Sequence, residues 1–408
     1  MQMGEGSRLS DGRIRVALIH YKDDASVGGS LRVGQLIGNH LDTRRVDAHF
    51  VFAYGGPGPV TASSRIPAHF IRSTGPKDMG GWMRVRQLIR ELKPDVLHFI
   101  NPVFWINASL WDWRGPRIMH QHGPVPQAIS GWRNRLTYGA FRRSMTRHVC
   151  VSRAVEVQVL QIGAARKESL CTIYNAIDNS IFVKLPAKAD ARKTLHLPEG
   201  AHLLGMVCRL VPEKGCAEGI RLMTYLPQNY HLVICGTGPL ENVLKQRAAA
   251  AGLDGRVHFL GSLDSVKTVY AAIDELLFLS KTEPFGLVIA EAMAAGVPVV
   301  GIASEGGYSD SAFPLVTEEN ARLLRLHTPL GRWDEVSDML LQELAQSVMV
   351  LSERPDERLA IVKQAKHWVS ERFDILSKAA ELSELYDSVL ANQPERRLRG
   401  KRHAFNFD

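Results

Sequence analysis

Residues 283–302 read EPFGLVIAEAMAAGVPVVGI, and this stretch decides the fold. Its apolar part, residues 286–295, predicts a helix that ends where Gly296 and Pro298 interrupt the pattern. The residues that follow, 297–302, predict a short buried strand. The stretch is therefore a loop, a helix and a strand in succession, which is the crossover unit of a parallel α/β sheet.

Two acidic residues mark this stretch, Glu283 before the helix and Glu291 within it. The backbone amides of Phe285, Gly286 and Leu287 at the helix start are free to bind sugar hydroxyls or phosphate, and the positive helix end favours anions. The two carboxylates accept hydrogen bonds from sugar or ribose hydroxyls. The alternative is that Glu283 caps the helix and Glu291 is simply solvated. The crossover setting favours a site for a nucleoside diphosphate sugar.

The length of the chain bounds its organisation. At 408 residues it is longer than one hydrophobic core normally supports, so we expect two domains of roughly 150–200 residues each. Hydrophobic residues make up 45% and charged residues 23%, which excludes an intrinsically disordered chain. The predicted units are an N-terminal Rossmann-like domain, a C-terminal Rossmann-like domain, a terminal helix and a basic tail, over residues 1–180, 181–370, 371–395 and 396–408.

Buried strands alternate with amphipathic helices in both halves of the chain. The first unit is a strand at 13–20 followed by a helix that Gly28 and Gly29 open, and the second series begins with a strand at 203–208. Both halves therefore predict parallel, helix-covered sheets of the α/β class. Further strands are predicted at 46–53, 95–100, 116–121, 147–151, 231–235 and 256–260, and helices at 83–92, 215–225, 334–348, 356–373 and 376–390.

The cysteine pattern bears on redox compartment and metal binding. The five cysteines form no Cys-x-x-Cys pair, and no Cys/His cluster has the spacing of a zinc site. We therefore expect a reduced, cytoplasmic protein without a structural metal. The first residues lack the apolar core of a signal peptide, and no apolar segment is long enough to cross a bilayer.

Positive charge is concentrated at the end of the chain. The formal net charge is +8 and the isoelectric point about 9.3, which favours contact with phosphate-bearing substrates or an anionic membrane surface. The tail 396–408 contributes part of this charge, and a solvated end is the simplest interpretation. Peripheral contact with the inner membrane surface is the alternative. Nucleic-acid binding is disfavoured because no stacking motif or recognition helix accompanies the tail.

The motifs at 283–301 resemble the signature of family-four retaining glycosyltransferases, which have the GT-B fold of two Rossmann-like doubly wound domains facing a central cleft. The segment 209–215 resembles the family's Arg-Leu-x-x-x-Lys-Gly, and 236–239 resembles its Gly-x-Gly-Pro turn. One departure is Cys208, which stands where glycine often precedes the arginine. Weaker likenesses in the N-terminal half are Gly28-Gly29, His122-Gly123, Val151-Ser152 and the segment 174–178.

The donor diphosphate gains negative charge as the glycosidic bond breaks, so fixed cations beside it lower the barrier. Arg209 and Lys214 are the candidates, and together they could take the place of a metal ion. The alternative is a pair of surface cations, one of which bridges Glu213. The resemblance further implies that Glu283 faces the transferred sugar and that Glu291 holds the donor ribose.

Glycines and histidines complete the predicted site. The resemblance implies that Gly28 and Gly29 lie in a loop at the cleft, and that Gly236 and Gly238 let the nucleotide approach the backbone; ordinary tight turns are the alternative. It also implies a histidine that projects into the cleft from the N-terminal domain. That residue is His122 by its adjoining glycine, but His120 lies on the same face of the strand, and the sequence does not decide between them.

The resemblance implies a retaining, hexosyltransferase-type enzyme that moves a sugar from a nucleotide diphosphate donor to an acceptor hydroxyl. The resemblance implies front-face attack, in which the leaving phosphate oxygen accepts the acceptor proton, so no cofactor or dedicated base is required. The acceptor is a glycan, a lipid-linked sugar or a small molecule; donor base and sugar stay open. The alternatives are a catalytically silent nucleotide-sugar-binding protein and a nicotinamide-dependent oxidoreductase, which the missing Gly-x-Gly-x-x-Gly disfavours.

Overall fold

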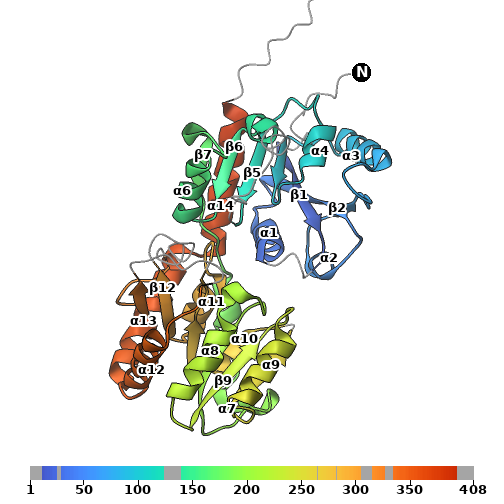
Figure 1. Ribbon diagram of the computed structural model, residues 1–408. Coiled ribbons are helices and arrows are strands. Elements are labelled where there is room, and N and C mark those ends of the chain that lie inside the picture. The colour runs from blue at the N-terminus through green and yellow to red at the C-terminus, as the bar shows by residue number, and fades with distance from the viewer. Residues whose placement is uncertain are drawn as a thin grey trace, which may run out of the picture.

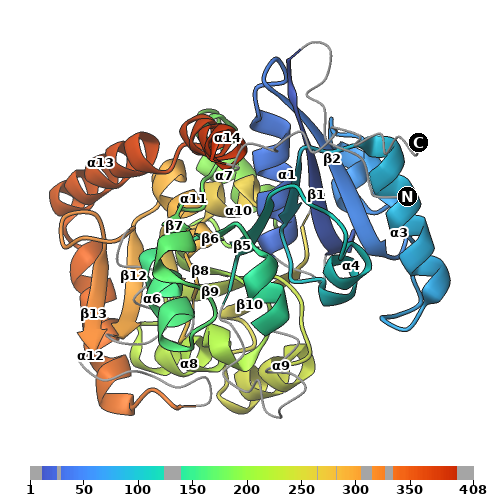
Figure 2. The same cartoon turned by 90° about the horizontal axis from the view of Figure 1, so that it is seen from above.

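The computed structural model contains two parallel sheets, each with helices packed on its faces (Figures 1 and 2). Every strand pair in both sheets is parallel, so each connection is a crossover, and most crossovers contain a helix. The predicted α/β class with two Rossmann-like halves is confirmed. The structure describes residues 12–24, 29–123, 139–263, 265–281, 283–304, 315–326 and 334–392.

The N-terminal sheet has the strand order β3-β2-β1-β4-β5-β6-β7. Its elements are β1 (Ile14–Lys22), α1 (Gly29–His40), β2 (Val46–Tyr54), α2 (Pro59–Ser63), β3 (Ala68–Phe70), α3 (Met79–Leu92), β4 (Val96–Phe99), α4 (Phe104–Ser109), β5 (Arg117–Gln121), β6 (Arg147–Cys150), α6 (Arg153–Gln161) and β7 (Leu170–Thr172).

The C-terminal sheet has the order β10-β9-β8-β11-β12-β13. Short 3-10 helices lie at η2 (Lys167–Ser169), η3 (Asn179–Phe182), η4 (Pro212–Lys214) and η5 (Met223–Tyr225). The remaining elements are α7 (Lys188–Thr194), β8 (His202–Val207), α8 (Cys216–Leu222), β9 (Tyr230–Cys235), α9 (Glu241–Ala250), β10 (Val257–Gly261), α10 (Lys267–Ala272), β11 (Glu275–Phe278), α11 (Leu287–Ala295), β12 (Val299–Ser304), β13 (Arg322–Leu326), α12 (Asp338–Ser352), α13 (Pro355–Arg372) and α14 (Ile375–Ala391).

Burial on both faces explains the apolar run in the middle of β1. In β1, Val16 and Leu18 pack into one cluster while Ala17 and Ile19 pack into another, and all four are at most 1% exposed. A strand that is covered on both sides cannot alternate apolar with polar residues, so its pattern differs from that of a half-exposed strand. The apolar run of β1 therefore indicates that this strand lies in the middle of the sheet.

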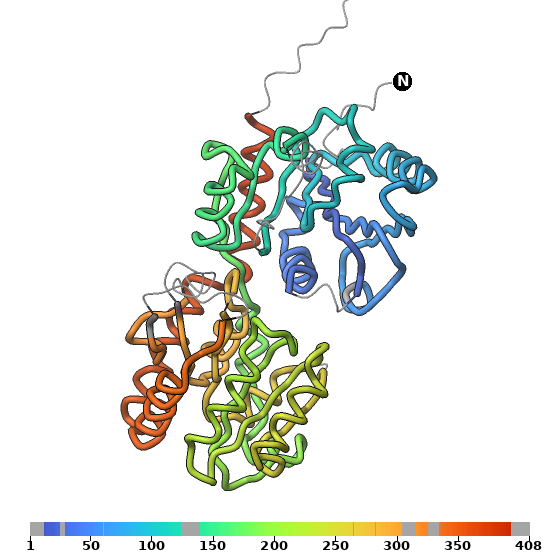
Figure 3. The backbone as a smooth tube through the Cα atoms, in the orientation of Figure 1, coloured from blue at the N-terminus to red at the C-terminus, as the bar shows by residue number. Residues whose placement is uncertain are grey.

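The last helix, α14, lies against the N-terminal sheet although it follows the C-terminal one in sequence (Figures 1 and 3). Ile375, Leu382 and Tyr386 are buried in the same cluster as residues of β1, β2 and β4. The Tyr386 hydroxyl lies 2.7 Å from Nδ1 of His98 on β4. This packing ties the end of the described chain to the N-terminal half.

Candidate functional site

The two sheets turn their carboxyl-terminal edges toward each other, and these edges meet at α11. Ser152 follows β6, and its hydroxyl donates a 2.6 Å hydrogen bond to the carbonyl of Pro284. A Cβ added at Gly29, the first residue of α1, would lie 3.7 Å from Cδ1 of Leu287, the first residue of α11. Segments from both halves of the chain therefore border the start of α11.

The start of α11 has the backbone geometry that its sequence predicts. Gly286 is the N-cap with φ of +89°, a left-handed conformation that residues with a side chain rarely adopt. Phe285 is 1% exposed and packs against Phe373 with ring centroids 5.5 Å apart. The buried ring and the glycine fix the direction in which the helix begins, so Glu283 is held beside its first turn.

Lys214 and Glu283 form an ion pair at this edge. The Lys214 Nζ lies 2.5 Å from Oε2 of Glu283, and the two side chains are 16% and 14% exposed. Burial lowers the pKa of Lys214, but the Glu283 carboxylate outweighs this effect and holds the pKa above its ordinary value. Lys214 is therefore a cation at neutral pH. The structure thus joins two predicted site residues that are far apart in sequence.

A second ion pair, between Lys281 and Glu218, is more deeply buried than the first. Lys281 and Glu218 are separated by 2.6 Å and are only 4% and 7% exposed in their side chains. The backbone amide of Lys281 also donates to the carbonyl of Glu213, over 2.8 Å. These contacts fasten the segment that leads to Glu283 onto η4 and α8, next to Lys214. Sequence reasoning missed Lys281 and Glu218, because neither belongs to a motif.

Arg209 and the two glycines of the 236–239 turn lie at the ends of β8 and β9. Arg209 is exposed, and its charge acts on Lys214. A Cβ added at Gly236 would lie 1.9 Å from the carbonyl oxygen of Cys208, and one at Gly238 would lie 2.5 Å from that of Leu210. Both glycines are therefore required for close backbone packing, and their proximity to a nucleotide stays a prediction.

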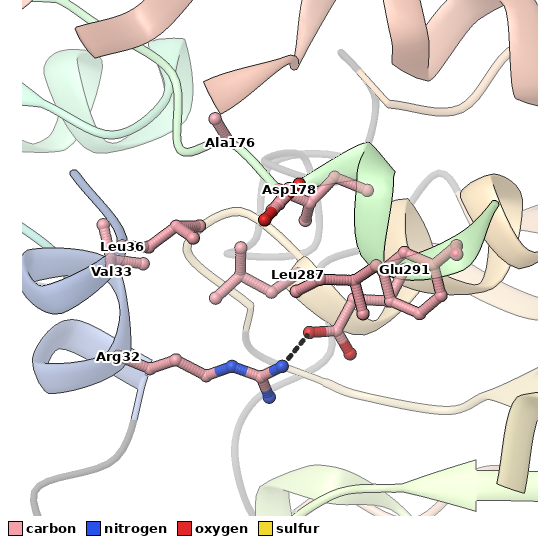
Figure 4. Close-up of a pocket in the computed structure, with 10 residues that line it drawn as sticks. Arg32, Val33, Leu36, Ala176, Asp178, Leu287 and Glu291 are labelled. Carbon is pink, nitrogen blue, oxygen red and sulfur yellow. Dashed lines mark ion pairs between the residues drawn. The ribbon is translucent and has the colours of Figure 1, made fainter. Parts of the chain in front are cut away.

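Glu291 is held from two sides. Its side chain is 6% exposed, so the alternative that it is simply solvated is wrong. Oε1 lies 3.2 Å from Nη2 of Arg32 on α1, and the Tyr270 hydroxyl donates to Oε2 over 2.9 Å. Figure 4 shows the Arg32 side chain reaching from α1 toward this carboxylate across a pocket that Asp178 and Leu287 also line.

Sequence reasoning did not identify Arg32 or Tyr270 as site residues. Arg32 stands in the first turn of α1, directly after the predicted glycine loop, and that position is the one signal that could have identified it. Tyr270 is 1% exposed on α10, and its pKa lies well above its ordinary value because of burial and the Glu291 charge. The tyrosine therefore stays protonated and keeps its hydrogen bond to Glu291.

Histidines stack at the carboxyl edge of the N-terminal sheet. The ring centroids of His98 and His120 are 5.3 Å apart, and those of His120 and His122 are 4.2 Å apart. Burial lowers the pKa of His120 to about 3 and holds that of His122 well below its ordinary value, so both imidazoles are neutral at pH 7. His120 is 1% exposed while His122 is only partly buried, which places His122 at the outer end of the stack.

Neither His120 nor His122 has a hydrogen-bond partner for its ring nitrogens among the described residues. A Cβ at the adjoining Gly123 would lie 3.9 Å from Cγ of Pro284, so the turn after β5 reaches the loop that carries Glu283. Buried imidazole nitrogens without partners are costly unless a ligand or water satisfies them. The outer histidine is therefore a candidate for contact with a hydroxyl-rich ligand.

Two parts of the predicted site and domain organisation are not among the residues that the structure describes. Gly28 and the tail 396–408 lie outside the described residues. In the described part of the chain, no group of three or more His, Cys, Asp or Glu side chains is arranged to hold a metal ion. None of the helices in those ranges combines the length and apolar character needed to cross a bilayer.

Comparison with known proteins places the chain in a family. The model described as Glycosyl transferases group 1 matches residues 187–317, and that described as Glycosyltransferase Family 4 matches residues 27–180. An uncharacterized glycosyltransferase of Methanocaldococcus jannaschii is 30% identical over 168 residues, which cover 37% of this chain and 43% of that protein. The lipopolysaccharide core biosynthesis glycosyltransferase LpsE of Rhizobium meliloti is 28% identical over 224 residues, or 55% of this chain and 60% of that protein.

The chain thus spans about half the length of these two curated relatives. Among solved structures, the Anabaena protein HepE in complex with UDP and glucose has a TM-score of 0.77 at 22% identity, over 92% of this chain and 100% of that one. This likeness confirms the predicted GT-B fold. Since family models match both halves of a chain with this fold, the protein belongs to the group 1 glycosyltransferases of family 4.

Proposed function

We propose that this protein transfers a hexosyl group, with retention of anomeric configuration, from a nucleoside diphosphate sugar to an acceptor hydroxyl. The observation that carries the proposal is the Lys214–Glu283 ion pair beside the N-terminal end of α11. A cation, a carboxylate and helix-end amides in one place match the phosphate and hydroxyl groups of such a donor. The proposal requires the sugar end and the nucleoside end of the donor to bind different residues at the carboxyl-terminal edge of the C-terminal sheet.

In the proposed complex, Lys214 and Arg209 neutralise the charge that grows on the β-phosphate as the glycosidic bond breaks. Glu283 then accepts hydrogen bonds from the transferred sugar, and the amides at the start of α11 bind its hydroxyls or the phosphate. Glu291 binds the ribose hydroxyls. No cofactor is needed in this scheme, because fixed cations of the chain supply the positive charge.

The acceptor enters from the N-terminal half, where His122 is the outer member of the histidine stack. A neutral imidazole both donates and accepts a hydrogen bond, so it can orient a sugar hydroxyl without taking its proton. The leaving phosphate oxygen accepts that proton as the acceptor oxygen attacks from the same face. A glycan is the acceptor class that we favour, because LpsE is named for lipopolysaccharide core biosynthesis.

The cellular location of the protein forms part of the same proposal. We place the protein in the cytoplasm, with peripheral contact to the anionic inner membrane surface. The net charge of +8 supports this contact.

The test is a transfer assay with UDP-, GDP-, ADP- and TDP-linked hexoses and a set of glycan acceptors, read by nuclear magnetic resonance of the product anomer. We expect one donor base to be used and the donor configuration to be kept. Lys214→Ala and Glu283→Gln should each lower transfer about 100-fold. The matched control is Lys245→Ala, which removes an exposed lysine that pairs with Glu241 on α9.

Three outcomes contradict the proposal or part of it. An inverted anomer would refute retention, and full activity of Lys214→Ala would refute the role of the ion pair. Nucleoside diphosphate binding without transfer to any acceptor would favour a catalytically silent binding protein instead.

A further inference from the structure

Two cysteines flank the segment that carries the proposed phosphate-binding cations. Cys208 follows the last residue of β8, Cys216 is the first residue of α8, and their sulfur atoms lie 3.4 Å apart. Residues 209–215 lie between them, including Arg209 and Lys214. Both cysteines are free thiols in the structure. A bond between these sulfurs would therefore close a small covalent ring around both cations.

The backbone is fixed at both ends of this segment. The Cys208 amide donates to the carbonyl of Cys235 over 3.0 Å, which extends the β8–β9 pairing. Gly215 has φ of +72°, and a Cβ there would lie 2.4 Å from the carbonyl oxygen of Leu279. Since a disulfide has a sulfur separation of about 2.04 Å, the two sulfurs, which lie 3.4 Å apart, must move closer before the bond can form.

The surroundings make Cys208 the reactive member. It is partly exposed, whereas Cys216 is 2% exposed. The hydrogen bond with Cys216 lowers the pKa of Cys208, and the nearby charges of Lys214 and Arg209 act in the same direction, although burial and the Glu283 charge oppose them. The same hydrogen bond and burial raise the pKa of Cys216.

The other three thiols have pKa values above the ordinary value of a cysteine. Burial raises the pKa of Cys150 to about 12 and that of Cys171 and Cys235 to about 11. These thiols stay protonated and are poor nucleophiles at neutral pH. They serve as internal controls in the same chain.

We propose that Cys208 and Cys216 form a reversible disulfide, with a peroxide as the oxidant. The Cys208 sulfur attacks one oxygen of hydrogen peroxide, the O–O bond breaks, and a sulfenic acid and water form. The Cys216 sulfur then attacks the Cys208 sulfur, loses its proton and displaces the hydroxyl as a second water. In total two thiols lose two electrons and two protons, and one peroxide is reduced to two waters.

The disulfide has a consequence for donor binding, and this part rests on the proposed function. Cys208 directly precedes Arg209, and Cys216 follows Lys214 by two positions. Drawing the sulfurs together shifts the segment that holds both cations. We expect the oxidised protein to bind UDP about tenfold more weakly than the reduced protein. A dithiol reductant should restore the affinity.

The experiment treats the full-length protein with a small excess of hydrogen peroxide, alkylates the remaining thiols under denaturing conditions, and maps the peptides by mass spectrometry. We expect Cys208 and Cys216 to escape alkylation as one cross-linked pair and to become available again after reduction. Cys150, Cys171 and Cys235 should be alkylated throughout. In Cys216→Ser the cross-link should be lost, and Cys208 should be found as the sulfenic acid trapped with dimedone.

Two results would overturn the proposal: alkylation of both Cys208 and Cys216 after peroxide, or oxidation of Cys208 alone in the wild-type chain. UDP binding is measured separately on the same samples. If the reduced protein binds no nucleoside diphosphate, the proposed function fails while peptide mapping still decides the disulfide. If the disulfide forms and UDP affinity is unchanged, the modification stands and its effect on the donor is refuted.

Discussion

Lys214 Nζ and Glu283 Oε2 lie 2.5 Å apart, so the loop after β8 and the loop after β11 are joined by an ion pair at the start of α11. Each group neutralises the other while no substrate is bound. In the proposed complex the donor phosphate replaces Glu283 as the partner of Lys214, and sugar hydroxyls replace Lys214 as the partners of Glu283. The pair therefore keeps two partly buried charges compensated until the donor replaces both contacts.

Replacing Lys214 by methionine tests this relationship through stability as well as activity. The variant leaves the Glu283 carboxylate, which is 14% exposed, without its partner. We expect the free energy of unfolding to fall by about 1–3 kcal/mol. Urea denaturation measures it. Lys245→Met, at an exposed pair, should change stability by less than about 0.5 kcal/mol, and an equal loss in both variants would contradict the account.

Arg32 and Glu291 give a second prediction. Arg32 is 54% exposed, so its ion pair contributes little to stability, and Arg32→Ala should cost less than about 1 kcal/mol. Because Arg32 occupies Glu291 Oε1, its removal should strengthen UDP binding a few-fold, whereas Glu291→Gln should weaken it about tenfold. Titration calorimetry measures both. Weaker binding by Arg32→Ala would show that the arginine contacts the donor itself.

Histidine burial predicts a dependence of stability on pH. Burial lowers the pKa of His20 to about 4, from 6.5 in an exposed chain. Between these values the unfolded chain binds a proton that the folded chain does not, so the free energy of unfolding falls as the pH falls from 6.5 towards 4. The slope is about 1.4 kcal/mol per pH unit for each such group.

His20→Gln should remove its share of that slope, which urea denaturation at a series of pH values between 4 and 7 measures. The control is His367→Gln, at a side chain that is 65% exposed on α13. A slope that stays the same in His20→Gln would contradict the assignment of a neutral, buried His20.

Gly215 tests the geometry of the cation loop. Gly215→Ala combines a left-handed φ of +72° with a Cβ placed 2.4 Å from Leu279 O, so we expect a loss of about 2–4 kcal/mol. Gly252→Ala is the matched control, since Gly252 has φ of +68° but nothing within 4 Å of the new Cβ. It should cost about 1 kcal/mol from backbone strain alone. Equal losses, measured by thermal unfolding, would show that the contact with Leu279 is not tight.

The elements that sequence predicted well are those whose signals are local. The α11 helix was predicted at 286–295 and is observed at Leu287–Ala295, because Gly286 and Gly296 mark both ends. The strands β1, β2, β4, β5 and β6 were predicted to within two residues of their observed ends. Strand β11 was missed, because it is only Glu275–Phe278 long and begins with an acid that is completely buried.

The candidate site was predicted only where a motif carries it. Lys214 and Glu283 belong to motifs, and the structure brings them together. The contacts of Arg32 with Glu291 and of Ser152 with Pro284 join residues from different halves of the chain. Such contacts depend on how the two sheets are placed, which no local pattern encodes.

The most direct test of the central claim is the shift in thermal midpoint of the protein with UDP, GDP, ADP, TDP and NAD at equal concentration. Selective binding to the native state stabilises it by about 1.4 kcal/mol for each tenfold excess over the dissociation constant. We predict that one nucleoside diphosphate raises the midpoint of the wild-type protein, and that it raises the midpoint of Glu291→Gln by less. A shift with NAD alone, or with none of the five, would contradict a nucleotide-sugar site at α11.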